Sequence, residues 1–256
     1  MKLEAENIEV RYREHIAVAV PELALDTGEF VALVGPNGAG KTSLLRALAG
    51  LRLSSGVVSW QGQAVASMTA RERARTIAYL PQTPRTGWPL KVKEIVELGR
   101  LPHRRFGQRP TAADTARIER ALEMTDTAGL ADRPIDALSG GERMRVQLAR
   151  AFAVDAPVLL VDEPVASLDP YHQLKVIELL AEYAAASRLV VAVLHDLTLA
   201  ARRCTRMVLL DAGAIAADGP PANVLNDEAL ARHYRISAYI AEHENRRLAV
   251  PWEMLG

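Results

Sequence analysis

The sequence has a single cysteine, Cys204, among its 256 residues. One thiol excludes an internal disulfide and any metal site built from several cysteines. Nothing in the cysteine content therefore requires an oxidising compartment. We interpret Cys204 as a small packed side chain without a catalytic role.

Long hydrophobic runs and a leader-like start are also missing. The longest purely apolar runs, such as Leu189–Leu194, fall far below the ~18 residues that a helix needs to span a bilayer. The first residues, Met1–Asn7, carry acidic side chains and lack the apolar stretch of a signal peptide. We therefore expect that, if the protein serves a membrane, another chain crosses it.

Neither charge is in excess, because 31 Lys and Arg residues are matched by 31 Asp and Glu residues. Proteins whose main partner is nucleic acid usually carry a basic excess, so we expect no nucleic-acid partner. The hydrophobic share of 49% is ordinary for a globular protein with a sizeable core. The length suits one large domain, or one domain with an inserted subdomain.

What the chain does have is the phosphate-binding pattern G-x-x-x-x-G-K-[S/T], at residues 35–42. The apolar segment Phe30–Val34 before it suits a buried parallel strand, and leucines at helical spacing follow it. In that context the glycines let backbone N–H groups surround a triphosphate. Lys41 is expected to reach the β- and γ-phosphates, and Thr42 to offer its hydroxyl to Mg²⁺. The flanking strand and helix favour a nucleoside triphosphate site over a chance match.

Three apolar runs predict core strands, and each is followed by polar residues suited to chemistry. Because ligands of parallel α/β sheets bind at the carboxyl ends of the strands, we expect these polar residues to meet. Helical patterns at residues 142–153 and 171–186 separate the strands, which predicts a mostly parallel sheet. The runs and the residues after them are Val31–Val34 with the glycine-rich loop, Val158–Val161 with Asp162 and Glu163, and Leu189–Leu194 with His195 and Asp196.

The remaining regions show other patterns. Residues from about 85 to 136 contain amphipathic helical patterns and no evident core strand, so we predict a helical subdomain inserted there. Its start, with Pro84, Gly87 and Pro89, is typical of a loop. The N-terminal third predicts half-exposed antiparallel strands. Residues 207–217 predict a hairpin. We interpret the arginines of residues 71–75 and 100–109 as solvated faces.

A second glycine pair occurs in Leu138-Ser139-Gly140-Gly141-Glu142. Ser139 is suited to cap a following helix, and the two glycines at its start would form another anion-binding nest. A second phosphate-binding motif so far from the first is unexpected within one chain. It is explained if the motif closes over a nucleotide held by another subunit.

With these motifs the chain resembles the ATP-binding subunit of ABC transporters over nearly its whole length. The resemblance implies an α/β P-loop NTPase fold, with a mostly parallel core, an antiparallel β subdomain and a helical subdomain at about 85–136, all within one domain of residues 1–256. It implies ATP and Mg²⁺ as cofactors. The nucleotide-binding residues would be Tyr12, Gly35, Pro36, Asn37, Gly38, Ala39, Gly40, Lys41, Thr42 and Ser43, with Ser139, Gly140 and Gly141 from the opposite protomer.

The resemblance also implies catalytic roles. Glu163 would polarise the attacking water, while His195 and Gln82 would sense the γ-phosphate. Asp162, Thr42 and Gln82 would serve the Mg²⁺ ion. The segment Ser167-Leu168-Asp169 resembles the D-loop of the family.

Each of these side chains also has a structural interpretation. Tyr12 could be an ordinary strand aromatic, and Gln82 a polar loop residue. His195 could be a satisfied buried histidine. Asp162 and Glu163 could form an acidic turn, but two carboxylates after four buried apolar residues favour Mg²⁺ and water.

Three short sequence segments narrow the resemblance further, to the group of importers for ferric siderophores, haem and cobalamin. They are residues 97–103, 168–173 and 194–201. Such a subunit would pair head-to-tail with a second copy of itself around ATP, and would lie against permease subunits at the cytoplasmic face of the membrane. An external substrate-binding protein would act indirectly. The alternatives are the motor of an exporter, and a soluble ABC ATPase that acts on nucleic acid or ribosomes.

Overall fold

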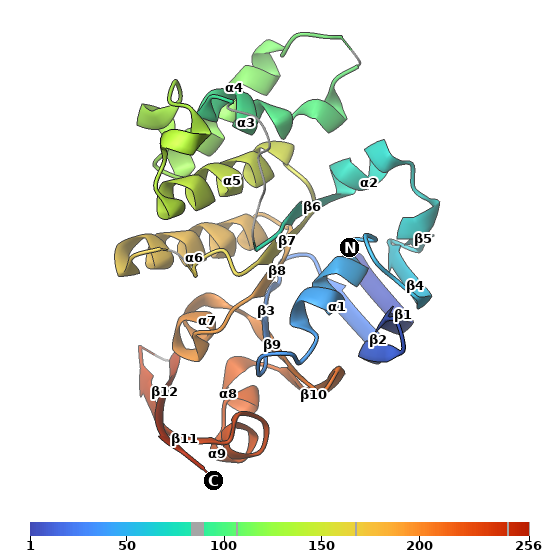
Figure 1. Ribbon diagram of the computed structural model, residues 1–256, viewed down its shortest axis with the longest axis vertical. Helices are drawn as coiled ribbons and strands as arrows, with labels where there is room; N and C mark the ends of the chain where they lie inside the picture. The colour runs from blue at the N-terminus through green and yellow to red at the C-terminus, as the bar shows by residue number, and fades with distance from the viewer. Residues whose placement is uncertain (83–89, 106, 167, 245, 256) are drawn as a thin grey trace.

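The computed structural model describes residues 1–82, 90–105, 107–166, 168–244 and 246–255. A six-stranded sheet with strand order β10-β9-β3-β8-β7-β6 crosses the molecule (Figure 1). Five of these strands run parallel and β10 is antiparallel, which confirms the predicted mostly parallel core. The strands are β3 (Phe30–Val34), β6 (Ile77–Leu80), β7 (Val158–Asp162), β8 (Leu189–Val193), β9 (Arg206–Asp211) and β10 (Ala214–Gly219).

An antiparallel sheet of four strands lies beside this core, in the order β2-β1-β4-β5, as the N-terminal third predicts. Its strands are β1 (Lys2–Tyr12), β2 (His15–Asp26), β4 (Ser55–Trp60) and β5 (Gln63–Ala64). Helix α1 (Lys41–Leu48) packs its leucines between the two sheets, in one hydrophobic cluster with Leu3 and Val31. Helix α2 (Ala70–Thr76) begins at a capping box made by Thr69 and Glu72.

The other face of the six-stranded sheet is covered by helices. They are α5 (Gly140–Val154), α6 (Pro170–Ala185) and α7 (Leu197–Arg203). Every residue of β3, β7 and β8 is buried, because helices or the second sheet cover both faces of these strands. The predicted hairpin is confirmed as β9 and β10.

The described part of residues 85–136 is helical and lies to one side of the sheet (Figure 1). Helices α3 (Val92–Leu98) and α4 (Ala112–Met124) pack against α5 and against each other. Their apolar faces, which include Ile95, Ile118 and Leu122, are buried. The predicted loop at Pro84, Gly87 and Pro89 falls outside the described residues.

The interpretation of the two arginine-rich stretches as solvated faces is wrong in part. The side chain of Arg100 is buried and donates to Asp114 Oδ1 at 2.8 Å and to the carbonyl oxygen of Ala153 at 2.8 Å. Arg71 and Arg75 donate to the carbonyl oxygen of Pro102, so α2 is joined to the helical region. Arginine side chains satisfy carbonyl oxygens at helix ends here, a role that sequence spacing does not reveal.

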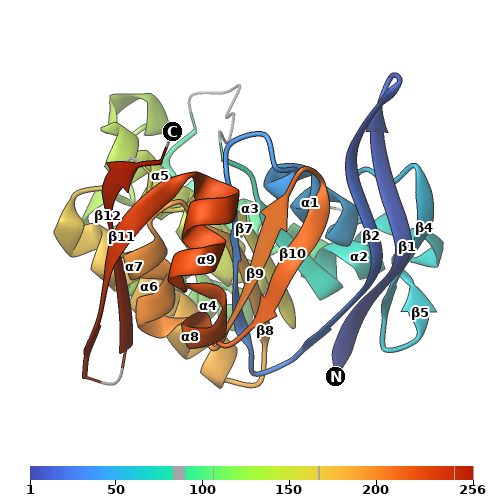
Figure 2. The same cartoon turned by 90° about the horizontal axis from the view of Figure 1, so that it is seen from below.

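After β10 the chain forms two short helices, a π-helical turn and a hairpin that the sequence analysis did not predict. These are α8 (Pro221–Val224), α9 (Asp227–Ala229), the turn Leu230–Tyr234, β11 (Ile236–His243) and β12 (Arg246–Met254). Strand β12 packs against α7 at the edge of the molecule (Figure 2). None of the helices in the described ranges combines the length and the apolar character that a membrane crossing requires.

Candidate nucleotide-binding and hydrolysis site

The glycine-rich loop joins the end of β3 to the start of α1. Gly35 and Gly40 have positive φ angles of 145° and 97°, which other residues adopt at a cost. A Cβ atom would lie 2.1 Å from the carbonyl oxygen of Leu210 at Gly35, and 2.4 Å from that of Ala17 at Gly40. Both positions therefore require glycine. The loop leads into a helix start without a side-chain cap, where backbone N–H groups are free to bind an anion.

Lys41 places its ammonium group within the loop. Its Nζ donates to the carbonyl oxygens of Gly35 and Pro36, each at 2.8 Å. Burial lowers the pKa of Lys41, while the charges of Glu163 and Asp162 act in the opposite direction. A buried cation held at the mouth of a helix N-terminus is suited to a polyphosphate.

Asp162 ends β7 next to the loop, and its side chain is fully buried. Thr42 Oγ1 donates to Asp162 Oδ1 at 3.1 Å, whereas Asp162 Oδ2 has no hydrogen-bond partner among the described residues. Burial raises the pKa of this carboxyl group. An unpartnered buried carboxylate oxygen beside a hydroxyl fits Mg²⁺, which uses few protein ligands and completes its shell with water and phosphate oxygens.

Glu163 follows Asp162 with a positive φ of 52°, a strained conformation for a residue other than glycine. Its N–H donates to the carbonyl oxygen of Val193 on β8 at 3.2 Å. The carboxylate accepts from Gln82 Nε2 at 2.7 Å through Oε2, and its Oε1 lies 2.7 Å from His195 Nε2. Three predicted catalytic residues from three strand ends therefore form one chain of hydrogen bonds.

Tyr12 lies beside the loop. The Ser43 hydroxyl reaches the Tyr12 hydroxyl at 3.5 Å, and this contact is the main cause of a lowered Tyr12 pKa. The guanidinium group of Arg52 stacks 4.3 Å from the centre of the Tyr12 ring. The sequence analysis missed Arg52, because no periodicity links it to Tyr12. Stacking of adenine on the Tyr12 face that Arg52 covers would require Arg52 to move.

The second glycine motif lies at the start of α5. Ser139 and Glu142 form a capping box, with Ser139 Oγ accepting from the Glu142 N–H at 3.2 Å and Glu142 Oε2 accepting from the Ser139 N–H at 2.8 Å. The motif lines a cavity of about 340 Å³ with Leu168, Asp169 and His172, and no residue of the glycine-rich loop lines it. Within one chain, the two glycine motifs therefore lie at different places. Ser167 lies outside the described residues.

Asp169 is a further residue whose local role the sequence analysis did not identify. It caps α6 through the N–H of His172 at 3.0 Å, and its other oxygen lies 2.8 Å from His172 Nδ1. Leu168 and Asp169 of the predicted D-loop segment lie next to the second glycine motif. An Asp-Pro pair directly at the start of a helical run was the sequence signal for this cap.

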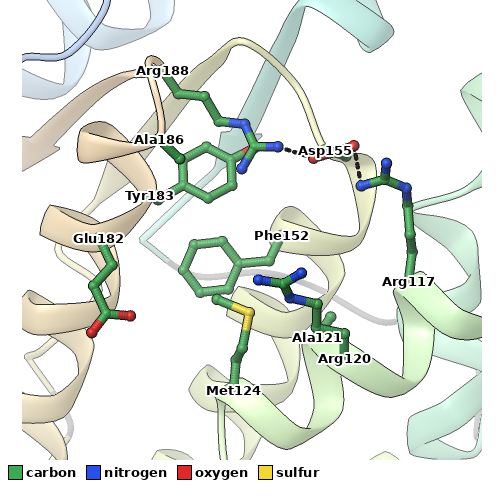
Figure 3. Close-up of a pocket in the computed structure, with 10 residues that line it drawn as sticks. All are labelled: Arg117, Arg120, Ala121, Met124, Phe152, Asp155, Glu182, Tyr183, Ala186 and Arg188. Atoms are coloured by element: carbon green, nitrogen blue, oxygen red, sulfur yellow. Dashed lines mark hydrogen bonds and ion pairs between the residues drawn. The ribbon is translucent and has the colours of Figure 1, made fainter.

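A separate cavity of about 270 Å³ lies between α4, α5 and α6 (Figure 3). Asp155 forms ion pairs with both Arg117 and Arg188 there, and Arg188 stacks 4.3 Å from the Tyr183 ring centre. Asp155 and Arg188 precede β7 and β8, so this cavity lies at the amino ends of the strands. It is therefore distinct from the candidate nucleotide site at their carboxyl ends.

A glycine-rich loop, a buried lysine and two successive carboxylates at the carboxyl ends of a parallel sheet define a P-loop nucleotide-binding protein. The family model described as "ABC transporter" matches residues 20–166. The chain belongs to this ABC transporter family, which confirms the resemblance and the predicted fold.

The names of similar proteins agree with this family assignment. The hemin import ATP-binding protein HmuV of Myxococcus xanthus is 43% identical over 250 residues, which cover 94% of this chain and 93% of the relative. HmuV of Streptomyces coelicolor is 46% identical over 83% of this chain and 76% of its own length. The cobalamin import ATP-binding protein BtuD of Halobacterium salinarum is 45% identical over 79% of this chain and 51% of its own length.

Solved structures share the fold. One is a chain of an inward-facing ABC transporter that is described as being of the metal-chelate type. It superposes with a TM-score of 0.81 at 25% identity, and the match covers 98% of this chain and 97% of that one. A bacterial ABC transporter cassette solved as a dimer gives a TM-score of 0.78 at 27% identity, covering 86% of this chain and 98% of the cassette.

Proposed function

We propose that this chain is the ATP-hydrolysing subunit of an importer for a metal chelate. We rank haem as the first candidate cargo, ahead of iron-siderophore and cobalamin. The observation that carries the hydrolytic part is the hydrogen-bonded set of Gln82, Glu163 and His195 beside the Thr42–Asp162 pair. Support for the cargo comes from the relatives: six with 40–46% identity are named for hemin import, and two with 45% identity are named for cobalamin import.

The residues around the loop have separate tasks in this proposal. Lys41 and the backbone N–H groups of the residues from Gly35 to Ser43, apart from Pro36, which has none, bind the phosphates. Tyr12 stacks on adenine. Glu163 orients the attacking water and accepts its proton, since its carboxylate is held from both sides by Gln82 and His195. When ATP enters, these two partners are free to turn toward the γ-phosphate and the ion.

Mg²⁺ would be held by Thr42 Oγ1, Asp162 Oδ2 and Gln82, together with phosphate oxygens. Bound there, it would neutralise charge on the β- and γ-phosphates. The structure supports this with the unpartnered Oδ2 atom. Among the described residues no group of three His, Cys, Asp or Glu side chains gathers to hold a metal alone, so the site depends on the nucleotide.

A second copy of the chain completes the site in this proposal. Ser139, Gly140 and Gly141 lie at an exposed helix start apart from their own glycine-rich loop, and are free to cover the γ-phosphate in a head-to-tail partner. The dimeric cassette that resembles this chain supports such pairing.

The remaining partners follow from the family. Permease subunits would anchor the chain at the cytoplasmic face of the membrane, and an external binding protein would deliver the cargo to them. We treat residues 1–256 as one cassette, in which residues 85–136 form the helical subdomain next to Gln82.

The hydrolytic role is tested with Glu163→Gln in the purified chain. We expect ATP turnover to fall by about 10²–10⁴-fold, the usual contribution of a general base. Equilibrium titration should show that ATP binding is retained, because Gln keeps the hydrogen-bonding shape of Glu. Turnover at the wild-type rate would remove Glu163 from this role.

The cargo is tested by uptake of labelled haem, ferric siderophore and cobalamin into cells whose only copy carries Glu163→Gln. Loss of one uptake identifies the cargo. Uptake of all three at wild-type rates would overturn the importer assignment. The exporter alternative, which shares every catalytic residue, would then be examined by the direction of transport.

A further inference from the structure

Arg52 covers one face of the Tyr12 ring. The central carbon of its guanidinium group lies 4.3 Å from the ring centre, which is the arrangement of a cation–π contact. One guanidinium nitrogen also donates to the carbonyl oxygen of Arg11 at 3.2 Å, so a second contact holds the group over the ring. The hydroxyl at the tip of Tyr12 lies 3.5 Å from the Ser43 hydroxyl in the first turn of α1. The ring is therefore held at one face and at its tip.

Arg52 reaches the ring from the β4 side of β1. The two strands are antiparallel neighbours, and the chain just before β4 continues beside β1. There the Ser54 N–H donates to the carbonyl oxygen of Glu9 at 2.8 Å, and the Ser54 hydroxyl accepts from the Arg11 N–H at 2.9 Å. Because the two chain segments run in opposite directions, Arg52, two residues before Ser54, stands beside the end of β1 that carries Tyr12.

The glycine-rich loop lies on the other side of β1, next to β2. A Cβ atom at Gly40 would lie 2.4 Å from the carbonyl oxygen of Ala17 and 2.7 Å from Cγ2 of Val18, and both of these residues belong to β2. Figure 2 shows β2 between β1 and the six-stranded sheet, with β4 on the outer side. Arg52 and the loop therefore flank Tyr12 from two different sides.

This placement decides which face of the Tyr12 ring is suited to a base. The face that Arg52 covers is turned toward β4, so the other face is turned toward β2 and the glycine-rich loop. A nucleotide whose phosphates lie in the loop has its base within reach of this second face. Adenine can stack there while Arg52 stays in place, and the ring then lies between a base and a cation.

We propose that Arg52 is a positioning residue for adenine, which holds the Tyr12 ring in the orientation in which its opposite face stacks on the base. This inference rests on the adenine contact of Tyr12 proposed above. Arg52 touches neither the base nor the phosphates, and acts through the ring. A ring that is already held in its bound orientation loses little conformational freedom when the base arrives, so more of the stacking energy is retained as affinity.

A positive charge near a phosphate site also attracts phosphates directly, and a ligand without a base separates the two effects. ADP and inorganic pyrophosphate share the diphosphate group, but only ADP carries a base. A contact that acts through Tyr12 changes the affinity for ADP alone, whereas direct attraction changes both affinities. Because ADP is a product of the reaction, its binding can be titrated without turnover.

Arg52→Ala tests the positioning role in the intact chain. Equilibrium titration should show that ADP binds about two- to fivefold more weakly than to the wild type, which is the contribution of one exposed cation–π contact. The affinity for pyrophosphate should stay unchanged. Arg52→Lys keeps the cation but loses the planar group that stacks on the ring, so its affinity for ADP should fall between the other two. Arg52 is exposed, and thermal unfolding checks that both variants keep the fold.

The matched control is Arg11→Ala. It removes the same charge one residue away from Tyr12, but the side chain that is lost pairs with Glu9. The backbone carbonyl group that accepts from Arg52 is kept. The affinities of this variant for ADP and for pyrophosphate should match those of the wild type.

A double-mutant cycle with Tyr12→Ala shows whether Arg52 acts through the ring. Tyr12→Ala should weaken ADP binding by about fivefold or more, the range of base stacking on an aromatic side chain. Once the ring is gone, Arg52→Ala should have no further effect. The double variant should therefore bind ADP as tightly as Tyr12→Ala does.

The outcomes separate this inference from the assignment of Tyr12. If Tyr12→Ala binds ADP as tightly as the wild type, the adenine contact of Tyr12 itself is wrong. If Tyr12→Ala weakens ADP binding but Arg52→Ala does not, or if the effect of Arg52→Ala persists in the double variant, the positioning role is overturned.

Two further results of Arg52→Ala would also overturn the positioning role. An equal loss of affinity for ADP and for pyrophosphate would mean that Arg52 attracts the phosphates directly. Tighter binding of ADP would mean that the base competes with Arg52 for the covered face of Tyr12.

Discussion

At the scale of single residues, Asp162 shows that a buried group suited to cation binding can lower the stability of the ligand-free protein. One oxygen of its buried carboxylate has no hydrogen-bond partner in the described part of the chain, and burial raises the pKa of the group. An ionised carboxylate that lacks a counterion in this position destabilises the ligand-free protein. The same oxygen is the feature that suits Mg²⁺, so stability and cation binding are opposed at this residue.

Asp162→Asn should separate these two effects. Without ligand we expect the free energy of unfolding to rise by about 1 kcal/mol, because a neutral amide is less costly to bury than an unpaired carboxylate. The added stability that ATP with Mg²⁺ gives over ATP with a chelator should shrink, since ligand stabilisation follows affinity. Thermal unfolding under the three conditions measures both. A variant that is less stable without ligand and keeps the full Mg²⁺-dependent gain would contradict the assignment.

Residue identities could be predicted from sequence where a motif fixes the backbone. The glycine-rich loop is such a case, because Gly35 and Gly40 have no steric alternative. The juxtaposition of Gln82, Glu163 and His195 also follows, since each comes after a core strand and parallel strands end at one edge. Arg52 could not be predicted, because its stacking on Tyr12 depends on how two separate segments cross.

At the scale of elements, hydrophobic periodicity predicts the buried strands and the helices that cover them, and fails at charged runs. Arg100 lies in a basic segment that suggests a solvated face, yet it is 6% exposed. It reaches Asp114 on α4 and two carbonyl oxygens at the end of α5. The structure uses this arginine to hold α4 and α5 together, and no count of charges in the segment distinguishes it from its neighbours.

Asp114 is correspondingly sensitive to acid. Burial alone would raise its pKa, but hydrogen bonds from Thr111 and Arg100 outweigh burial and lower the pKa to about 2 from 3.8. A lowered pKa means that the carboxylate contributes stability above pH 3.8, and that this contribution is lost as the pH falls toward 2.

Asp114→Asn should therefore destabilise the protein by about 3 kcal/mol at neutral pH, since it leaves the Arg100 charge buried without its counterion. Denaturant unfolding between pH 7 and pH 3 should show a smaller loss of stability on acidification than in the wild type. Asp132→Asn is the control, because that carboxylate is exposed and forms a loose ion pair with Lys91 at 3.4 Å. This substitution should change the free energy of unfolding by no more than about 0.5 kcal/mol. If the two substitutions change the free energy of unfolding equally, the buried Arg100–Asp114 pair contributes no more to stability than the exposed pair.

The C-terminal hairpin is the element that sequence patterns miss altogether. Its inward residues pack against α7 through Ala249, while Val250, Trp252 and Met254 stay exposed. A strand pattern assumes that apolar residues face a core. Here Ile236, Ala238 and Ile240 pack against the core, whereas the large apolar side chains of β12 stay exposed and break that pattern.

At the scale of the whole molecule, the glycine-rich loop and the second glycine motif lie apart within one chain. Lys41, Asp162 and Glu163 surround the glycine-rich loop, whereas Ser139 and Gly140 line a different cavity. If two copies pair head-to-tail, each hydrolytic site combines the loop side of one copy with the Ser139 side of the other. Defects on the two sides should then complement each other between chains.

Mixing Glu163→Gln with Gly140→Asp tests this arrangement. A Cβ at Gly140 meets nothing within 4 Å in the single chain, so the new carboxylate leaves the fold intact and acts only by repelling a partner's phosphate. Each variant alone has no intact site. Random pairing makes about half of the dimers mixed, each with one intact site of two, so the mixture should recover about a quarter of wild-type ATP turnover.

The control for that recovery is a mixture of Glu163→Gln with the double variant Glu163→Gln, Gly140→Asp, which cannot form an intact site in any pairing. Turnover should remain at the level of Glu163→Gln alone. Equal turnover in the two mixtures would mean that Gly140 does not act across the dimer. A rise in the first mixture alone would assign Ser139–Gly141 to the partner's nucleotide, because an intramolecular role for this motif permits no rescue between chains.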